Sequence, residues 1–346
     1  MNKKILLIFL LIWSFYSCSS KKLETNEKEL ANSQNPVEER IAFISRNDTL
    51  VGYLSKPVNK SKFPVIVVLH SASHGHHDNE IYNHLEKNMS EIGVGVFTYD
   101  RRGSGESAGV FETASFEDLA NDALATVKIL KKREDIDTTN IGLYGISQGG
   151  WLGPIAYSLN KKDISFMILA SSCGVTPAIQ MKYSAITTLE KNGYSDSIIS
   201  IAKGLINISN EYYRGNVSIA DAQRELDIYN DAEWFEDTYL DSQLPEDVGD
   251  TKWIREMDFE PVSYFKEVDI PLVLFYGEFD RWVPIQSSID IWQEALKSAN
   301  SDVQIFQIKD SGHLMILNED DNPEQEIFSE QYTSLLKQWV TQTVGK

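Results

Sequence analysis

Residues 141–152 read Ile-Gly-Leu-Tyr-Gly-Ile-Ser-Gln-Gly-Gly-Trp-Leu and carry the strongest signal in this sequence. Ile141 to Tyr144 is a short apolar run typical of a buried strand, and a helical pattern follows the turn. Gly145 and Gly149 flank that turn, where residues without a Cβ let two chain segments approach closely. A turn this tight strains the backbone of Ser147 and exposes its hydroxyl at a helix N-terminus. The stretch therefore predicts a G-x-S-x-G nucleophile elbow.

Strand and helix patterns alternate on both sides of this turn. Apolar runs rich in β-branched residues predict strands over 63–69, 94–99, 141–144, 164–170, 271–276 and 303–308. Helical patterns between and after them cover 80–92, 116–133, 148–159, 284–299 and 324–343. This alternation predicts an α/β fold with a mostly parallel, doubly wound sheet and helices on both faces. Alternating segments over 41–45 and 49–55, joined by Asn47-Asp48, add an N-terminal antiparallel hairpin.

One long segment, residues 174–268, interrupts the alternation between two predicted strands. Helical stretches with many aromatic residues dominate it, and no buried-strand pattern occurs in it. Residues 221–260 hold 14 acidic residues against three basic ones, which is −11 of the formal net charge of −19 for the whole chain. An insertion of this length is typical of a lid or binding element, so we expect a helical cap. The core would then comprise residues 40–173 and 269–346.

A serine needs a base to act as a nucleophile, and the later strands supply candidates. His313 follows the strand over 303–308 and is the expected general base. Asp280 follows the strand over 271–276 and is the expected acid that orients the imidazole. Glu278 and Asp310 are rival acids. We prefer Asp280 because it lies deeper past its strand end, where the acid loop must reach the histidine.

The oxyanion of a tetrahedral intermediate needs backbone donors. We expect one at the N–H of Gln148, directly after the nucleophile. The loop after residue 69 should supply the other, from Ala72 or its rival Ser71.

That loop also holds four of the six histidines, and its His-x-His-His-Asp pattern over 74–78 superficially resembles a binuclear zinc motif. The spacing does not fit, and only His84 and His313 remain as further histidines, so we expect no metal site. Residues 100–107 contain a G-x-G that lacks the third glycine of a phosphate loop. We interpret them as a tight loop at the pocket wall, with Arg101 or Arg102 in structural ion pairs.

The N-terminus is typical of an export signal. Residues 1–17 carry two lysines and a 12-residue apolar run, too short to span a membrane, and then Ser17-Cys18. We expect a lipoprotein-type signal peptide with Cys18 as the lipidated residue, with plain cleavage or an uncleaved anchor as the alternatives, and residues 18–39 as a flexible polar tether. The protein would then be exported and anchored in a bacterial cell envelope by its lipid alone. Cys173 would lack a partner and is expected to be a buried small residue.

Composition excludes several classes of protein. The 346 residues are 42% hydrophobic, which is enough for a real core and rules out a disordered chain. With 32 basic and 51 acidic residues, the chain has no basic surplus for binding nucleic acid.

Taken together, these residues resemble the α/β-hydrolase superfamily from about residue 41 to the C-terminus, outside much of the insertion. The resemblance is nearest to bacterial dienelactone hydrolase-like and serine aminopeptidase-like (S33/S9-related) proteins. It is carried by residues 99–107, 145–154, 277–284 and 311–313, which read YDRRGSGES, GISQGGWLGP, GEFDRWVP and SGH. The resemblance implies a triad of Ser147, Asp280 and His313, no cofactor, and a cap over the active site. Such proteins often have His-Gly after the third strand, where this chain has His70-Ser71.

Three functions follow from this pattern. The first is a carboxylic-ester hydrolase that works through an acyl-enzyme intermediate on a small ester. The second is a serine peptidase of the same fold, which would need an acidic group to hold the amino terminus of a short peptide. The third is a non-catalytic binding lipoprotein, which the presence of all three triad residues argues against.

Overall fold

The computed structural model describes residues 37–345 except 59, 74, 298–301 and 318–326. The predicted signal peptide, Cys18 and most of the predicted tether lie outside the described residues. No helix in the described part of the chain is long and apolar enough to cross a membrane.

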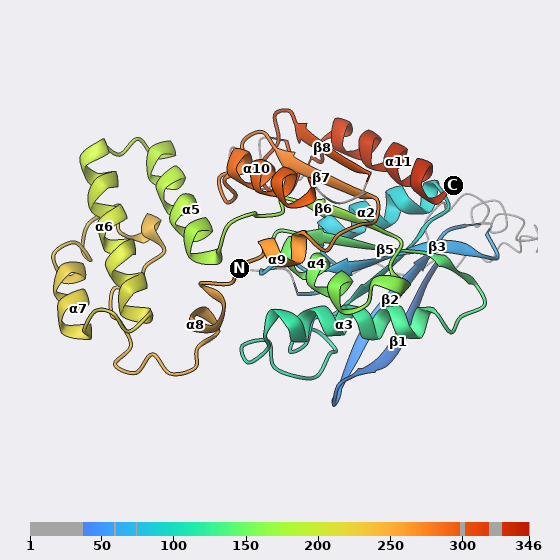
Figure 1. The fold of residues 1–346 in the computed structure, drawn as a ribbon, viewed down its shortest axis with the longest axis horizontal. Coiled ribbons are helices and arrows are strands. Elements are labelled where there is room, and N and C mark those ends of the chain that lie inside the picture. The colour runs from blue at the N-terminus through green and yellow to red at the C-terminus, as the bar shows by residue number, and fades with distance from the viewer. Residues whose placement is uncertain (1–36, 59, 74, 298–301, 318–326, 346) are drawn as a thin grey trace, which may run out of the picture. The chain divides into compact units, whose positions relative to one another are not determined.

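An eight-stranded sheet forms the core, in the order β1-β2-β4-β3-β5-β6-β7-β8 (Figure 1). Its strands are β1 (Val37–Ser45), β2 (Asp48–Lys56), β3 (Phe63–Leu69), β4 (Gly95–Tyr99), β5 (Ile136–Ile146), β6 (Phe166–Ala170), β7 (Leu272–Gly277) and β8 (Val303–Ile308). The β1–β2 hairpin and the β2–β4 pair are antiparallel, and the other neighbours are parallel. The predicted mostly parallel sheet with an N-terminal hairpin is confirmed.

Helices cover both faces of the sheet. One face packs against α3 (Phe116–Leu130), α4 (Gly149–Leu159), α9 (Val262–Phe265) and α10 (Ile285–Leu296), and the other against α2 (Glu80–Glu91) and α11 (Glu330–Val344). Every residue of β3, β4, β6 and β7 is buried, which explains why these strands read as continuous apolar runs. Because β3, β5, β6, β7 and β8 run parallel to one another, their carboxyl ends lie at the same edge of the sheet.

Local sequence sets where the helices begin. A capping box between Ser115 and Asp118 starts α3, and Ser329 caps the first turn of α11 through the N–H of Tyr332. The predicted start of the last helix at residue 324 is wrong, because residues 327–329 are extended and the helix begins at Glu330. The apolar spacing that suggested an earlier start lies ahead of this cap, and a serine cap fixes the first turn more strongly than spacing does.

The segment between β6 and β7, which we call the insertion, is mainly helical. It contains α5 (Pro177–Lys191), α6 (Asp196–Tyr213), α7 (Ile219–Asp227), a 3₁₀ turn η2 (Glu236–Thr238), α8 (Lys252–Glu256) and α9. Helices α5, α6 and α7 share an apolar cluster of their own with the segment that follows α7, and this cluster is separate from the two clusters on the sheet. In Figure 1, α5 and α8 lie nearer to the sheet than α6 and α7 do.

Candidate active site

Ser147 lies in the turn between β5 and α4, with a φ of +54°. Positive φ is costly for a residue with a side chain, so the surrounding structure must impose it. A Cβ on Gly145 would collide with the carbonyl of Gly149, and a Cβ on Gly149 would collide with the carbonyl of Leu69. The two glycines are therefore required by close backbone approach, and the turn they permit presents Ser147 at the start of α4.

His313 and Asp280 meet at the same edge of the sheet. The Nδ1 of His313 lies 2.9 Å from Oδ2 and 3.0 Å from Oδ1 of Asp280. Both side chains are buried, and Oδ1 of Asp280 also accepts the backbone N–H groups of Trp282 and Val283 at 2.8 and 3.0 Å. The carboxylate is thus fixed by its own loop, and it in turn fixes the ring of His313.

The rival acids are placed differently. Oε2 of Glu278 accepts the backbone N–H of Asp310 at 3.0 Å, and both residues are exposed. Among the three predicted acids, Asp280 is the one for which the structure gives a contact with His313. Gly277 explains the close approach of the two loops, since a Cβ there would collide with the carbonyl of Gly312.

A cavity of about 420 Å³ joins these residues. Ser147, Gln148, His313 and the loop residues Ser71 and Ala72 all line it. The structure thus brings the predicted nucleophile, base and oxyanion residues to one cavity, with Asp280 behind His313. Its remaining walls are largely apolar and aromatic: Phe116, Trp151, Pro177, Met181, Trp253, Trp282 and Leu314.

The loop after β3 is held by Arg101. Its Nη1 donates to the carbonyls of Ser71 and Ala72 at 3.0 and 2.8 Å, while its guanidinium stacks 3.5 Å above the ring of Phe111. The backbone N–H of Ser71 lies 3.4 Å from the hydroxyl oxygen of Tyr82, on the core side of the loop. Because adjacent amide and carbonyl groups point in opposite directions across a peptide plane, Arg101 orients the N–H of Ala72 away from itself.

A structural ion pair was expected for Arg101 or Arg102, and Arg102 confirms it. Arg102 forms a buried ion pair with Asp122, at 2.6 and 2.8 Å, as expected of a structural arginine. Arg101 binds backbone carbonyls of the site loop, a role that the sequence did not predict. In the sequence, Arg101 is marked by its place directly after a strand and next to a G-x-G turn. That place fits an ion pair and the binding of backbone carbonyls equally well.

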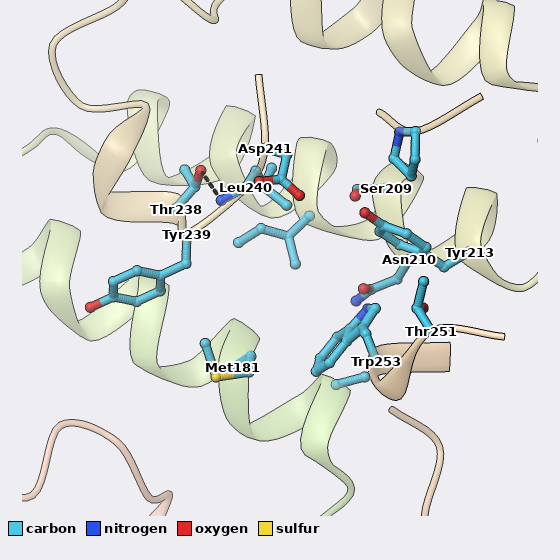
Figure 2. Close-up of a pocket in the computed structure, with 13 residues that line it drawn as sticks. Met181, Ser209, Asn210, Tyr213, Thr238, Tyr239, Leu240, Asp241, Thr251 and Trp253 are labelled. Atoms are coloured by element: carbon cyan, nitrogen blue, oxygen red, sulfur yellow. Dashed lines mark hydrogen bonds between the residues drawn. The ribbon is translucent and has the colours of Figure 1, made fainter. Parts of the chain in front are cut away.

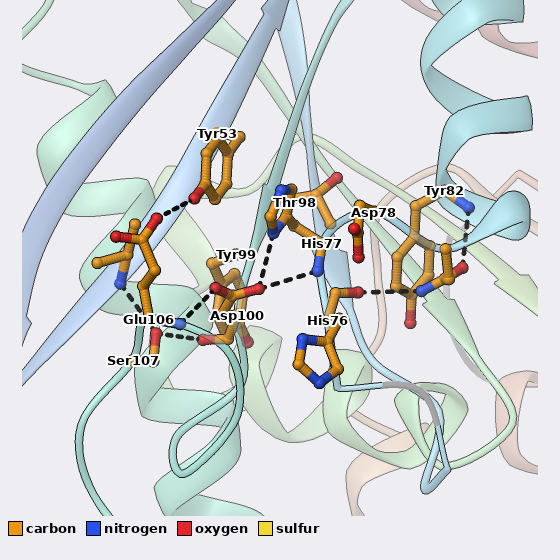
Figure 3. A network of polar contacts seen from close by, with 12 residues as sticks. Tyr53, His76, His77, Asp78, Tyr82, Thr98, Tyr99, Asp100, Glu106 and Ser107 are labelled. Atoms are coloured by element: carbon orange, nitrogen blue, oxygen red, sulfur yellow. Dashed lines mark hydrogen bonds and ion pairs between the residues drawn. The ribbon is translucent and has the colours of Figure 1, made fainter.

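Two histidines of this loop, His70 and His77, have structural partners, and Figure 3 shows His77 beside Asp100; His74 lies outside the described residues. His70 is buried and contacts the carbonyl of Tyr99 at 2.5 Å and the hydroxyl of Tyr82 at 3.1 Å. His77 stacks on Tyr53 at 3.6 Å and lies 2.8 Å from Asp100. Within the described residues, no three His, Cys, Asp or Glu side chains lie close enough together to hold a metal ion.

The insertion brings a charged residue, Glu256, to the wall of the cavity. Glu256 of α8 lines it and pairs with Lys252 at 2.5 Å. Burial raises the pKa of Glu256 above its usual value, against the opposing effect of Lys252. The sequence did not predict Glu256 as a cavity residue. The spacing of acidic residues in an irregular segment does not show which of them faces a cavity.

Cys173 is buried and has no disulfide partner among the described residues, and burial raises the pKa of its thiol to about 12. It therefore behaves as the small buried residue expected from the sequence, and it supplies no nucleophile.

Comparison with known proteins agrees with this geometry. The esterase EstD of Thermotoga maritima is 25% identical over 304 residues, covering 86% of this chain and 66% of that protein. This chain therefore spans slightly less than two thirds of the length of that relative. The structure also resembles Est1E from Butyrivibrio proteoclasticus with bound ferulic acid, with a TM-score of 0.55, 18% identity, and coverage of 88% of this chain and all of that one. The Pyrococcus horikoshii acylaminoacyl peptidase matches with a TM-score of 0.59 and 16% identity, over 93% of this chain and 44% of that one.

At such low identity the two structural matches show the fold, which is that of the α/β-hydrolases. The model of the family described as "Serine aminopeptidase, S33" matches residues 64–321, which include the turn at Ser147, the loop of Asp280 and His313. With three quarters of its length matched, this chain belongs to the S33 serine aminopeptidase family of α/β-hydrolases.

Proposed function

We propose that this protein is a serine hydrolase that cleaves carboxylic esters with neutral, largely apolar groups next to the scissile bond. The observation that carries the proposal is the cavity that joins a strained, half-buried Ser147 to His313, whose Nδ1 contacts Asp280. The esterase named above supports ester chemistry, and the family description keeps peptide chemistry as the alternative.

The proposed reaction begins with attack of the Ser147 Oγ on the ester carbonyl, while Nε2 of His313 takes the hydroxyl proton. Asp280 holds Nδ1–H and stabilises the imidazolium that forms. The N–H groups of Gln148 and Ala72 stabilise the oxyanion, and Arg101 positions the second of these donors. The C–O bond then breaks, His313 returns the proton to the leaving alcohol, and an acyl-enzyme remains. Water, deprotonated by His313, releases the acid and restores Ser147.

The cavity favours a neutral substrate over a free amino terminus. An aminopeptidase would need an unpaired carboxylate near the scissile bond. The carboxylate of Glu256 at this cavity is instead paired with Lys252, and its raised pKa shows that burial disfavours its charge. Phe116, Trp151 and Trp282 offer wide apolar surfaces in its place.

The test compares the wild-type chain with Ser147→Ala on p-nitrophenyl butyrate and on an aminoacyl p-nitroanilide. We expect ester turnover that falls at least about 10³-fold in the variant, and little amide turnover in either chain. Ser158→Ala is the matched control, because Ser158 lies on α4 and bonds only the carbonyl of Ile155. Amide turnover that depends on Ser147 and exceeds ester turnover would establish the peptidase instead.

We further propose that the insertion is a cap and that the chain is exported and lipid-anchored at Cys18. Support for the cap comes from α5 and α8, which supply one wall of the cavity. Support for the anchor comes from the N-terminal sequence alone. A Cys18→Ser chain should move from the membrane fraction of the expressing cells to the soluble fraction of the envelope, or remain uncleaved. Unchanged processing and membrane binding would contradict lipidation at this residue.

A further inference from the structure

A second cavity lies within the insertion, next to the catalytic one. It encloses about 380 Å³ between α5, α6 and the segment from η2 to α8 (Figure 2). Met181 and Trp253 line both cavities, so each of the two side chains borders the catalytic cavity as well as this one. A molecule that extends from Ser147 past these two side chains would enter the second cavity.

Three polar groups of this second cavity come from one face of α6, and the segment from η2 to α8 adds Thr238, Tyr239, Asp241 and Thr251. Ser209 and Asn210 are at least nine-tenths buried, and Tyr213 follows one turn later. The structure gives the Asn210 amide and the Ser209 hydroxyl no hydrogen-bond partner among the described residues. Figure 2 shows the Asn210 amide and the Tyr213 hydroxyl pointing toward the middle of the cavity, with Trp253 beside the amide.

Buried polar groups without a protein partner are costly, and a ligand or water must satisfy them. An asparagine amide offers both a donor and an acceptor, which matches a secondary amide in a ligand. Apolar wall comes from Ala178, Ile206, Leu240 and Pro245, and the charged residue in the lining, Asp241, is exposed to solvent. The site therefore fits an apolar chain that ends in an uncharged hydrogen-bonding group.

We propose that this cavity binds the far end of an extended ester substrate, with Asn210 reading an uncharged amide there. This inference rests on the proposed ester hydrolysis and specifies its substrate class. A substrate with an apolar chain between ester and amide would place its scissile carbonyl at Ser147 and its amide at Asn210. Met181 and Trp253 would line the passage between them.

The test uses two p-nitrophenyl esters of matched length, the 6-acetamidohexanoate and the nonanoate. In the wild-type chain we expect the acetamido ester to have the higher kcat/KM. Asn210→Leu keeps the volume of the side chain and removes the amide, and it should lower the ratio of the two kcat/KM values about tenfold. Asn207→Leu is the matched control on the same helix, because Asn207 is exposed and bonds Lys182.

A second variant, Leu240→Trp, fills this cavity without touching the catalytic one. It should lower kcat/KM for both long esters relative to p-nitrophenyl butyrate. The assignment of Asn210 would be overturned if Asn210→Leu left the ratio of kcat/KM for the acetamido ester to that for the nonanoate unchanged. It would also be overturned if Asn207→Leu lowered this ratio equally. Long-ester turnover that is unchanged in Leu240→Trp would overturn the cavity as a substrate site.

A chain that hydrolyses no ester would contradict the proposed function, and the cavity would still be testable. Binding of the acetamido ester to Ser147→Ala can be followed by quenching of tryptophan fluorescence. Binding that weakens about tenfold when Asn210→Leu is added would support the site without catalysis. Binding that is unaffected by this second change, or that is absent from both chains, would overturn it.

Discussion

The catalytic edge of the sheet and the second cavity in the insertion differ in whether their polar groups have hydrogen-bond partners within the protein. At the sheet edge, Asp280 is fixed by two backbone N–H groups and by His313, and the loop beside them is fixed by Arg101. In the insertion, Asn210 faces a cavity with its amide unsatisfied by the described protein. The first arrangement is ready for a reaction before substrate arrives. The second leaves its polar groups to a ligand or water, and our proposal accordingly assigns selectivity to the insertion and chemistry to the sheet.

The largest expected effect is a loss of kcat when Asp280, the acid at the sheet edge, is replaced. Asp280→Asn should lower kcat about 10⁴-fold, because the amide cannot hold His313 in the tautomer that accepts the serine proton. The measurement is steady-state turnover of p-nitrophenyl butyrate. Glu278→Gln is the control, since Glu278 bonds the backbone of Asp310 at the surface. A comparable loss in Glu278→Gln would move the acid to the rival residue.

The next effect concerns the loop that supplies an oxyanion donor. Arg101→Met keeps the length of the side chain but removes both bonds to the carbonyls of Ser71 and Ala72. We expect kcat to fall about 10- to 100-fold with KM nearly unchanged, because the donor acts mainly in the transition state. Arg101→Lys should recover part of the loss. Arg40→Met removes an exposed arginine that pairs with Glu106, and it should leave kcat unchanged.

A rise in KM without a fall in kcat in Arg101→Met would contradict a positioning role. It would indicate that Arg101 shapes the substrate pocket through Phe111 instead.

The charge of the insertion predicts a smaller effect on selectivity. Residues 221–260 carry a net charge of −11, so an anionic ester should be repelled on its way to the cavity. We expect kcat/KM about tenfold lower for mono-p-nitrophenyl glutarate than for p-nitrophenyl hexanoate, after correction for their rates with hydroxide. The gap should narrow at high salt, which screens surface charge. Equal turnover at low salt would show that the insertion does not select by charge.

The smallest effect concerns the half-buried Glu86 on α2, away from both cavities. Burial raises the pKa of Glu86 to about 7, with Thr98 donating to it at 3.0 Å. Below pH 4.5 the group is protonated in both states and costs nothing, whereas above pH 7 the folded state carries a disfavoured charge. Glu86→Gln should therefore raise the free energy of unfolding by about 1–2 kcal/mol at pH 8 and by much less at pH 5.

Urea denaturation at the two pH values measures this difference. Glu80→Gln, an exposed position on the same helix, should change little at either pH. A gain in Glu86→Gln that is equal at pH 5 and pH 8 would contradict titration of this carboxyl.

Much of the sheet could be predicted from the sequence because local signals determine it. Strands buried on both faces must be apolar throughout, and the turn at Ser147 requires glycine on both sides. Asp280 could be preferred over Glu278 by its depth in the loop, and its contact with His313 agrees with that preference.

The insertion could be predicted only as helical and acidic. Which residues of α6 face a cavity depends on how α5, α6 and η2 pack together, and helical periodicity does not encode that packing. For this reason the sequence did not predict that Asn210 and Glu256 line cavities. The contact of Arg101 with the loop after β3 was not predicted, because its target is backbone, which leaves no complementary residue in the sequence.

The most direct test of the central claim is labelling by a fluorophosphonate, with the modified residue located by mass spectrometry of peptides. We expect one adduct, on Ser147, in the wild-type chain. We expect no adduct in Ser147→Ala and much slower labelling in His313→Gln, since the serine then lacks its base. An unlabelled wild-type chain, or an adduct that persists in Ser147→Ala, would contradict Ser147 as the nucleophile.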